Sequence, residues 1–436
     1  MERKLAAFFG FDAAGTNLRR EMLAGVTTFV TMAYIVAVNP AILKAAGIPE
    51  GPSMVATVMT AMFGTLLMGL YANRPFAIAP YMGENAFVAY TVVRVLGFRW
   101  QAALAVVFIA GVLFTLLTIA RVRQWMTDAV PPGLRFSFAA GIGLFLAFIG
   151  LNEAGIVTLG VAGAPVRIGA LNSAPAMVAA FGFVGIAMLT LWRVPGAILI
   201  GILLAAAAAF ALGVAPVPAR FVSLPPSPAP ILLKLDFGAA FGWRFFGVLL
   251  TIFVMALVDT LGTLVGVSER AGLLDAEGSL PQIERPMMAD ALATTFAALA
   301  GTTTAGAFIE SAAGVSVGGR TGMTAVVTAT LFGISLFFAP TVAAIPPQAY
   351  GPALVIVGAT MLAPIRKIDF DDYTELLPAF AVIALMSFTY NVGVGIAAGF
   401  VLYPWFKVAA RRGSEVRPGL WMLNILSTML FAFYPY

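Results

Sequence analysis

Four acidic residues lie inside or at the edge of long apolar stretches, where charged side chains are rare. Glu310 stands in FIESAAGVSVGGRTGM, Asp259 interrupts FFGVLLTIFVMALVDTLGTLVGV, and Glu84 precedes Asn85 in APYMGENAFVAYTVV. Asp290 stands near the start of MMADALATTFAALAG. An ionised carboxylate is costly at membrane depth, so such residues usually mark a substrate or ion path. The sequence therefore predicts a small polar site enclosed by an apolar body.

The composition fixes the class of protein. Hydrophobic residues make up 61% of the 436 residues and charged residues 10%, whereas an ordinary soluble domain is about a quarter charged. A soluble chain of this composition could not cover its apolar surface with polar groups. We therefore predict an all-α polytopic membrane protein.

The composition also limits the chemistry of the site. The chain has no cysteine and no histidine, which excludes disulfides, thiolate metal sites and histidine proton shuttles. Any proton coupling must use carboxylates, and we predict neither a metal nor a cofactor. One connection carries an acidic cluster after Arg366 and Lys367, which we expect to be a solvated, ion-paired turn. The cluster consists of Asp369, Asp371, Asp372 and Glu375.

Apolar runs between charged, proline and glycine residues indicate the membrane spans, since crossing a core of about 30 Å takes roughly 20 helical residues. They predict fourteen spans, near 20–43, 54–71, 83–97, 100–120, 134–152, 175–192, 196–213, 245–267, 286–301, 309–319, 321–340, 349–364, 374–390 and 393–408. A proline-rich connection, 214–243, separates the two sets of seven. The tail 418–434 is apolar and bounded by prolines, so we expect it at the interface or against the bundle.

The charge distribution indicates the orientation. Eighteen of the 25 lysine and arginine residues fall in connections on the side of the N-terminus, and basic residues favour the cytoplasmic side. We expect a multi-pass protein of the cell inner membrane with both termini in the cytoplasm. Residues 1–20 lack a signal-peptide pattern and are expected to lie along the membrane surface. The net charge of +5 is a topology signal and predicts no nucleic-acid partner.

Two sets of seven spans suggest an inverted repeat, because an odd-numbered unit duplicated in tandem inserts the second time with opposite orientation. GENAF at 83–87 and IESAA at 309–313 place an acid, a small polar residue and an alanine in the same order. Both belong to short spans that follow non-helical sequence, RPFAIAP and GTTTAGAF. Such backbone is tolerated at membrane depth only inside protein. We predict that extended segments 75–80 and 303–308 meet near the midplane, before a broken third and a broken tenth span whose N-termini face the site.

Several strings are similar to a known family. APYMGENAFVAYTVV, VDTLGTLVGV, FIESAAGVSVGGRTGMTAVV and IDFDDYTELLPAFAVIALMSFTYNVGVGIAAGF resemble the adenine/guanine/hypoxanthine permeases, the AzgA-like branch of the nucleobase:cation symporter-2 family, over about residues 15–410. The resemblance implies secondary-active, proton-coupled uptake of purine bases by a 7+7 inverted repeat, and no enzyme activity. It also implies a core domain, 1–122 with 244–341, and a gate domain, 123–243 with 342–436.

The resemblance places the family's binding elements on four residues of this chain: Asn85, Asp259, Phe308 and Glu310. Purines are flat and neutral and carry N–H donors and ring-nitrogen acceptors. Phe308 could stack on such a ring, and carboxylic groups accept its N–H bonds or donate when protonated. The sequence departs from many relatives at Ala256, where an aspartate is common, and at Glu84, where an apolar residue is common.

One of three carboxyl groups is expected to hold the coupling ion, which we take to be a proton rather than sodium; they belong to Glu84, Asp259 and Glu310. Thr31 is a further candidate for lining the site, although threonines also bond back to their own helix. Structural alternatives exist for the acids: Glu84 and Glu310 could serve their helix starts, and Asp259 could pair with a base. We expect Asp290 to be a structural acid in the first turn of its span.

Other functions stay open on sequence alone. A same-fold transporter could carry uracil, xanthine or an anion, but an anion carrier of the sulfate-permease type should have positive groups at the half-helix starts. An enzyme would need a nucleophile or metal set, and a channel would spread polar residues along a pore. Glycines in GVSVGGRTG and GLFLAFIG are expected to permit close helix packing. The small residues of GILLAAAAAFALG, 201–213, would suit a homodimer contact. The expected partners are thus a purine, a proton, the lipid bilayer and a second copy.

Overall fold

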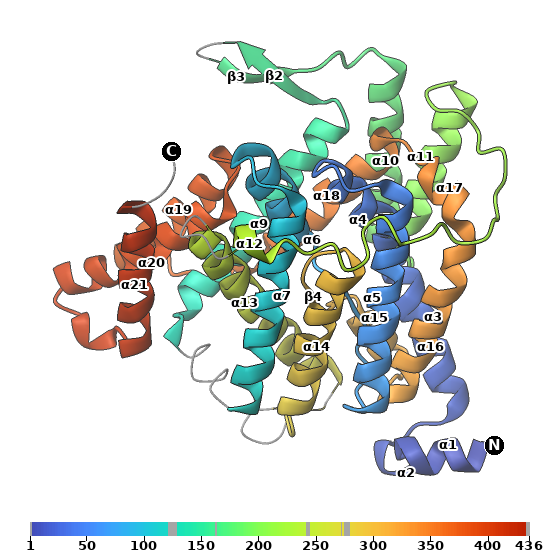
Figure 1. Cartoon of the computed structure of the whole chain (residues 1–436), viewed down its shortest axis with the longest axis horizontal. Helices are drawn as coiled ribbons and strands as arrows, with labels where there is room; N and C mark the ends of the chain where they lie inside the picture. The colour runs from blue at the N-terminus through green and yellow to red at the C-terminus, as the bar shows by residue number, and fades with distance from the viewer. Residues whose placement is uncertain are drawn as a thin grey trace.

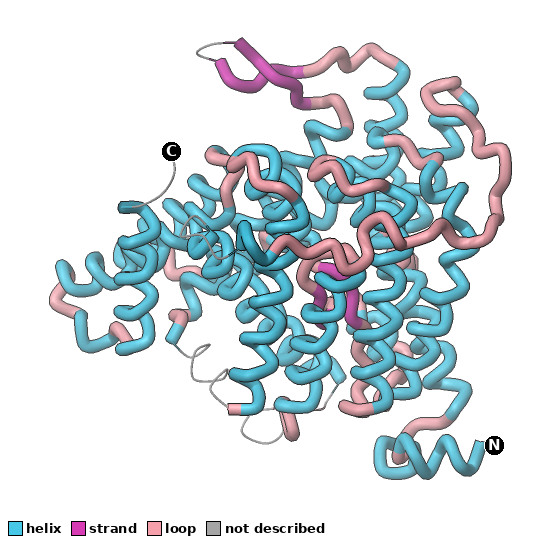
Figure 2. Tube along the Cα trace, in the orientation of Figure 1, coloured by secondary structure: helices cyan, strands magenta, loops and turns pink. Residues whose placement is uncertain are grey.

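The structure is a computed structural model that describes residues 2–120, 129–161, 164–240, 245–271, 273 and 280–432. Figures 1 and 2 show a helical bundle with one small pair of strands at its centre and a second pair at its periphery. The first half contains α1 (Glu2–Phe9), α2 (Phe11–Ala14), α3 (Leu18–Met32), α4 (Ile35–Lys44), α5 (Glu50–Leu70), β1 (Ile78–Pro80), α6 (Met82–Ala86), the π-helix η1 (Phe87–Val95), α7 (Trp100–Ile119), α9 (Pro132–Glu153), β2 (Val157–Val161), β3 (Ala164–Ile168), α10 (Ala174–Leu191) and α11 (Ala197–Ala211).

The second half follows the proline-rich connection and again places one central strand between long helices. It contains α12 (Phe237–Ala240), α13 (Phe246–Ala271), α14 (Glu284–Ala300), β4 (Ala305–Ala307), α15 (Ser311–Ser316), α16 (Gly322–Ser335), the 3-10 turn η3 (Leu336–Phe338), α17 (Ala339–Ala343), α18 (Pro347–Met361), η4 (Ala363–Lys367), α19 (Tyr373–Phe388), α20 (Val392–Ala409), η5 (Gly413–Glu415) and α21 (Pro418–Ala432).

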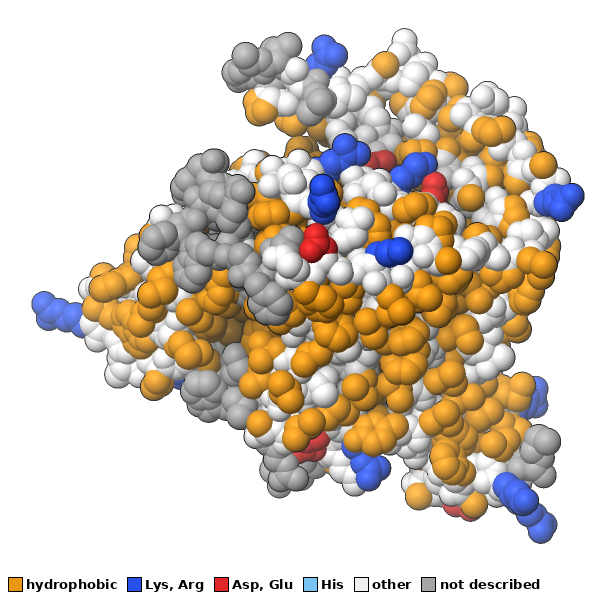
Figure 3. Space-filling view, in the orientation of Figure 1, with side chains coloured by type: hydrophobic (Ala, Val, Ile, Leu, Met, Phe, Trp, Pro, Cys, Tyr) orange, Lys and Arg blue, Asp and Glu red, His pale blue; other side chains and the backbone are white. Residues whose placement is uncertain are grey.

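The helices are those of a membrane protein. In the described part of the chain, 8 helical segments are long and apolar enough to cross a bilayer, and three shorter apolar helices accompany them. Figure 3 shows hydrophobic side chains across the middle of the visible face, with most lysines and arginines toward two opposite edges. Eleven of the fourteen predicted spans overlap these segments, and the other three, 83–97, 286–301 and 309–319, overlap the helices α6 with η1, α14 and α15. The predicted all-α polytopic class is confirmed.

Some details differ from the prediction. The first span is interrupted between α3 and α4, where the N–H groups of Val36 and Ala37 bond to carbonyls three residues back, both at 3.1 Å. The connection after α9 forms an antiparallel hairpin, β2–β3, that the sequence did not predict. Two of the eighteen basic residues expected on the side of the N-terminus, Arg121 and Arg123, lie outside the described residues, as do the predicted boundaries at 122/123 and 243/244.

The two ends of the chain agree with expectation. Helices α1 and α2 lie across the end of the bundle rather than along it (Figure 1). At the other end, α21 packs against α20, where the Asn424 amide donates to the carbonyls of Phe400 at 3.0 Å and Val401 at 3.1 Å. The tail is therefore packed against the bundle, as one of the two predicted placements required.

Helix packing repeats between the two halves. Helix α5 packs on α16, and its counterpart α14 packs on α7; α9 packs on α19, and its counterpart α18 packs on α10. A Cβ at Gly322 in α16 would collide with the carbonyl of Gly69 in α5, and one at Gly358 in α18 would collide with that of Gly143 in α9. Glycine thus permits the close helix crossings, as predicted for GVSVGGRTG and GLFLAFIG.

The small residues of α11 serve a contact within the chain. A Cβ at Gly201 would collide with Ile186 in α10, and Ala205 faces Gly182 of the same helix. The exposed positions of α11 include Leu203 and Leu204 as well as Ala207 and Ala211. Packing within the protomer thus uses part of this small-residue surface, and the expected homodimer contact of 201–213 stays a prediction.

Candidate functional site

Strands β1 and β4 cross at the centre of the bundle as an antiparallel pair in which Ala79 lies opposite Gly306. Each strand has an outer edge whose backbone groups need partners inside an apolar body. The Thr65 hydroxyl of α5 accepts from the Ile78 N–H at 2.9 Å and donates to the Ile78 carbonyl at 3.0 Å. The Thr294 hydroxyl of α14 does the same for Ala305, at 3.3 and 2.7 Å. The predicted extended segments are confirmed, and a threonine from each repeat holds them.

An aromatic residue comes directly after each of the two strands. The Tyr81 N–H donates to the Thr304 carbonyl at 3.0 Å, and the Phe308 N–H donates to the Ala77 carbonyl at 2.9 Å, so the two residues occupy equivalent places in the two repeats. Their buried rings are nearly parallel, with an interplanar angle of 9° and centroids 6.0 Å apart. Phe308 is where the sequence predicted an aromatic face, and the sequence analysis missed Tyr81.

Glu310 stands between β4 and α15, two residues after Phe308. Its Oε1 accepts a hydrogen bond of 2.6 Å from the hydroxyl of Tyr34, which lies in the interruption between α3 and α4. The carboxyl group is half-buried, and the neighbouring Ile309 is 59% exposed. Glu310 is thus held by a donor from the other repeat and lies between a buried ring, Phe308, and an exposed side chain, Ile309.

Asn85 belongs to a buried network of amides and hydroxyls. Its amide nitrogen donates to Asn39 Oδ1, and the Asn39 amide donates to the hydroxyls of Thr57 at 2.7 Å and Thr302 at 3.1 Å. The network ties α4, α5, α6 and the segment before β4 together. The Asn85 oxygen has no partner among the described residues, so this side chain keeps one free acceptor.

Glu84 and Asp259 complete the predicted acids. Glu84 in α6 is fully buried, and neither carboxyl oxygen has a hydrogen-bond partner on another described residue. Asp259 in α13 is half-buried and forms no ion pair with a described residue. The charged groups that act on Glu84 most strongly are Asp259 and Asp290. The structural alternatives of capping for Glu84 and ion pairing for Asp259 therefore find no support in the described contacts.

Asp290 was predicted in the first turn of its helix. It lies beyond that turn, because α14 already begins at Glu284. Its side chain is buried. Its Oδ1 accepts from the backbone N–H of Ala307 in β4 at 3.1 Å, and its Oδ2 accepts from the Thr260 hydroxyl at 2.7 Å. Asp290 is a structural acid, but its structural role is to hold the second strand.

The remaining candidate, Thr31, is satisfied within its own helix, where its hydroxyl lies 2.9 Å from the Thr27 carbonyl and 2.8 Å from that of Thr28. Its role in the site stays a prediction. Sequence reasoning missed Tyr34, Asn39 and Tyr81. The string YIVAVNP holds two of them, and its polar Asn-Pro pair inside an apolar run was the available signal.

A second polar cluster joins the two halves at the end of the bundle where α9 ends. The Glu153 carboxylate accepts from the hydroxyls of Tyr90 in η1 at 3.0 Å and Tyr350 in α18 at 3.2 Å. Beside it, the Thr91 hydroxyl donates to the Tyr390 carbonyl, and the ring of Tyr390 packs edge-on against Tyr90. These contacts close the space between η1 and the helices α9, α18 and α19.

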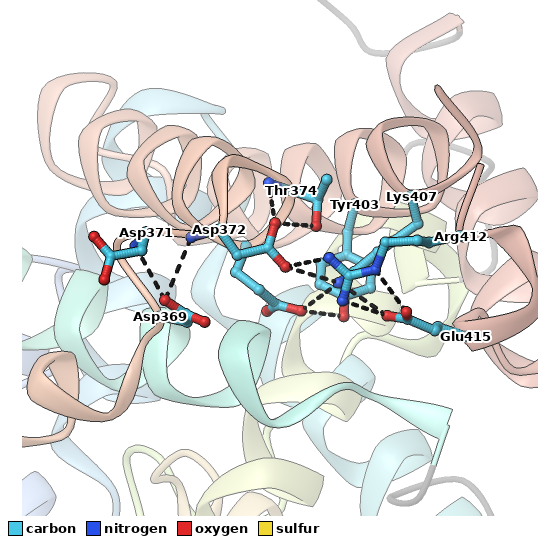
Figure 4. A network of polar contacts seen from close by, with 9 residues as sticks. Asp369, Asp371, Asp372, Thr374, Tyr403, Lys407, Arg412 and Glu415 are labelled. Carbon is cyan, nitrogen blue, oxygen red and sulfur yellow. Dashed lines mark hydrogen bonds and ion pairs between the residues drawn. The ribbon is translucent and has the colours of Figure 1, made fainter. Parts of the chain in front are cut away.

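The acidic cluster after η4 forms ion pairs, as predicted, through Asp372 and Glu375, whereas Asp369 accepts from the N–H groups of Asp371 and Asp372. Figure 4 shows Asp372 beside Lys407, in the last turn of α20, and Arg412, just beyond that helix, so the basic partners do not come from the preceding connection. Lys407 Nζ lies 2.9 Å from Glu375 Oε1 and is 1% exposed, and Arg412 lies 2.6 Å from Asp372 Oδ2. Hydrogen bonds from Thr374, and then from Arg412, lower the pKa of Asp372. Within the described residues no group of three or more side chains is arranged to hold a metal ion.

The fold resembles that of solved transporters. The transmembrane domain of a cyanobacterium bicarbonate transporter, BicA, superposes with a TM-score of 0.66 at 17% sequence identity, covering 88% of this chain and 97% of that one. The murine anion transporter Slc26a9 in its inward-facing state gives a TM-score of 0.64 at 12% identity, covering 90% of this chain and 69% of that one. At these identities the likeness concerns the fold alone.

Sequence comparison is more specific. A putative permease of Methanocaldococcus jannaschii is 45% identical over 98% of both chains. The guanine/hypoxanthine permease PbuG of Bacillus subtilis is 39% identical over 98% of this chain and 100% of its own. The adenine permease AdeQ of Escherichia coli is 37% identical over 94% and 92%. Residues 19–401 match the Permease family, so the chain is a multi-pass membrane transporter that belongs to this family.

Proposed function

We propose that this protein imports purine nucleobases by proton symport. The observation that carries the proposal is the pairing of two parallel aromatic rings, Tyr81 and Phe308, with the Glu310 carboxylate two residues beyond the second ring. An aromatic face is worth about 1–3 kcal/mol per stacked base. Carboxylates supply acceptors for the N–H groups of the ring edge. Relatives named as guanine/hypoxanthine and adenine permeases support the same substrate class.

Within this proposal the purine stacks against Phe308 and Tyr81, and Glu310 and Asp259 bond its edge. Tyr34 orients Glu310, and Asn85 offers its unpaired oxygen. The coupling proton is carried by one of the acids of this region. Both strands enter the site from opposite directions and are fixed by side chains of α5 and α14, so the binding groups of the two repeats keep a defined spacing.

Transport would alternate by movement of a core domain, 1–122 with 244–341, against a gate domain, 123–243 with 342–436. Mutual packing of α5, α7, α14 and α16, and separately of α9, α10, α18 and α19, supports this division. The Tyr90–Glu153–Tyr350 contacts would then bridge core and gate on the outer side. The excess of basic residues on one side supports an inner-membrane protein with cytoplasmic termini.

A homodimer is part of the proposal, and it would use exposed apolar side chains of the gate, such as Leu203 and Leu204. An anion substrate, which the fold alone would permit, agrees poorly with the site. Both broken spans begin with an acid rather than a basic residue, Glu84 in the first repeat and Glu310 in the second, and a carboxylate at Glu310 would repel an anion.

Uptake into proteoliposomes tests the function. Radiolabelled adenine, guanine, hypoxanthine and uracil are offered under an imposed inward proton gradient to the wild type, Glu310→Gln and Glu50→Gln. Glu50 pairs with Lys44 at the protein surface and serves as the control acid. We expect accumulation of at least one purine that collapses with an uncoupler, is lost in Glu310→Gln and survives in Glu50→Gln.

Two results would overturn the proposal. If a folded wild-type preparation accumulates uracil but no purine, the substrate class is wrong. If a purine accumulates equally with and without the proton gradient, and follows a sodium gradient instead, proton symport is wrong while the substrate class stands.

A further inference from the structure

Glu310 and Glu84 differ in their surroundings, and this difference bears on which of the two carries a proton. Glu310 is half-buried, accepts a hydrogen bond from Tyr34 and lies beside an exposed residue, Ile309. The hydrogen bond from Tyr34 favours the charged form of this carboxyl group. Glu84 has the opposite environment, because it is 0% exposed and neither of its oxygens bonds to another described residue.

A buried carboxylate without a counter-charge or hydrogen-bond donor is among the most costly groups a protein can contain, and it usually becomes neutral by binding a proton. Ionising Glu84 would add a negative charge close to Asp259 on α13 and Asp290 on α14, the charged groups that act on it most strongly. Tyr81, next to α6, is the other titratable group that interacts with it.

The other elements packed against α6 supply no described counter-charge, because their titratable groups are engaged elsewhere. These contacts are Tyr34 with Glu310 and Lys44 with Glu50 for α4, Arg94 with the Ala45 carbonyl and Tyr90 with Glu153 for η1, and Glu153 with Tyr350 for α9. Arg135, at the far end of α9, belongs to the first turn of that helix. The surroundings of Glu84 therefore favour its neutral form.

We propose that Glu84 is the residue that carries the coupling proton, and that it is uncharged in the conformation seen here. The proposal rests on the proposed function and names the acid responsible for coupling. On the outer side a proton from water forms an O–H bond with one carboxyl oxygen. On the cytoplasmic side that bond breaks and the proton returns to water. Between these events the neutral side chain can be buried as the structure shows it.

The position of Glu84 links the proton to the substrate. It lies next to Asn85, whose amide anchors the Asn39 network, and three residues after Tyr81, whose ring faces Phe308. A change in charge at Glu84 would act on both neighbours at once. Proton loss would thus favour a rearrangement of α6 and weaken the aromatic face that holds the purine.

Infrared spectroscopy of the reconstituted full-length protein tests the protonation state without reference to any substrate. We expect the wild type at neutral pH to show a carbonyl stretch of a protonated carboxylic acid that decreases in Glu84→Gln and is unchanged in Glu50→Gln. An identical band in the wild type and Glu84→Gln would overturn the proposal.

A second variant covers the case in which the glutamine disturbs folding. Because a neutral carboxyl without partners contributes no hydrogen bond to lose, Glu84→Leu should unfold at a temperature equal to or above that of the wild type. Strong destabilisation of Glu84→Leu would mean that the carboxylate is ionised and paired, and would contradict the proposal.

Transport measurements then test whether Glu84 couples proton movement to purine uptake. For each purine, proton-driven accumulation is compared with gradient-free exchange in the same vesicles. The ratio should fall at least about tenfold in Glu84→Gln, because the amide has no proton to release near neutral pH. An unchanged ratio in Glu84→Gln would overturn the role of Glu84. Absence of purine exchange in the wild type would instead overturn the proposed function, and the infrared result would still decide the protonation of Glu84.

Discussion

Thr65 and Thr294 hold the backbone of strands β1 and β4 by hydrogen bonds, so removing their hydroxyl groups should lower the stability of the fold. Thr65→Val replaces the hydroxyl by a methyl group of similar size and leaves the buried N–H and C=O of Ile78 without their partner. Each unsatisfied buried polar group costs about 1–3 kcal/mol, so we expect about 2–6 kcal/mol of lost stability. Thr294→Val should have an effect of the same size, because Thr294 serves both groups of Ala305.

Thermal unfolding of the purified protein in detergent measures this effect, with purine binding as the functional readout. Thr330 is the matched control, because it is exposed and its hydroxyl bonds only to the Val326 carbonyl of its own helix, at 2.9 Å. Thr330→Val should change stability by no more than about 0.5 kcal/mol. Thr65→Ser, which keeps the hydroxyl, should retain most of the stability. If Thr65→Val and Thr294→Val behave like Thr330→Val, these threonines do not hold the strands.

Three further outcomes are expected. Tyr34→Phe should weaken purine affinity about tenfold or more in a calorimetric titration, because a hydrogen bond to a charged acceptor is worth about 1.5–3 kcal/mol; unchanged affinity would separate Tyr34 from the site. Glu153→Gln should loosen the outer contacts, so a cysteine introduced as Thr91→Cys should react about fivefold faster with an impermeant maleimide, which corresponds to about 1 kcal/mol; an equal rate would show that these contacts do not close the outer side. The lowered pKa of Asp372 stabilises the fold above its unfolded value of about 4, so thermal stability should decline as pH falls below that value, and less steeply in Arg412→Gln.

The fold could be largely predicted because the bilayer imposes length and composition on every span. The two extended segments were visible as short, proline- and glycine-rich interruptions at equivalent places in the two halves. The interruption at Tyr34 was not visible, because Ala33 and Tyr34 are compatible with a continuous helix and the break depends on tertiary contacts. The hairpin β2–β3 lies in the connection between the predicted spans 134–152 and 175–192, so the spans gave no information about it.

The site was predicted in part, and the errors have physical causes. The repeat alignment from GENAF and IESAA placed Phe308 opposite Met82, whereas the strand contacts make it the equivalent of Tyr81, one residue earlier. The alignment of the half-helices differs by one residue from the alignment of the strands, and for this reason the sequence analysis did not find Tyr81. The partner of Glu310 could not be found either, because Tyr34 lies 276 residues away in the sequence and meets it only through the packing of α3 against α15.

Asp290 illustrates how one repeat can need an acid that the other lacks. The Thr65 hydroxyl bonds to the backbone of Ile78, and the Thr294 hydroxyl bonds to the backbone of Ala305, so Ile78 and Ala305 are equivalent. Two residues further along each strand, Pro80 in β1 therefore corresponds to Ala307 in β4. Proline has no N–H to satisfy, and four residues before Thr65, where the second repeat has Asp290, the first repeat has Ala61. The carboxylate is thus present in the repeat whose strand has a backbone donor.

This correspondence gives a prediction with a rescue. Asp290→Ala should destabilise the protein by about 1–3 kcal/mol, because the buried N–H of Ala307 loses its acceptor. Adding Ala307→Pro removes that N–H and reproduces the Pro80 and Ala61 pair of the first repeat, so the double variant should regain part of the lost stability. Ala307→Pro alone should gain nothing, since it leaves the Asp290 carboxylate without one donor. Thermal unfolding of the four proteins in one double-mutant cycle measures the coupling. Additive losses in the double variant would show that Asp290 does not act through this backbone group.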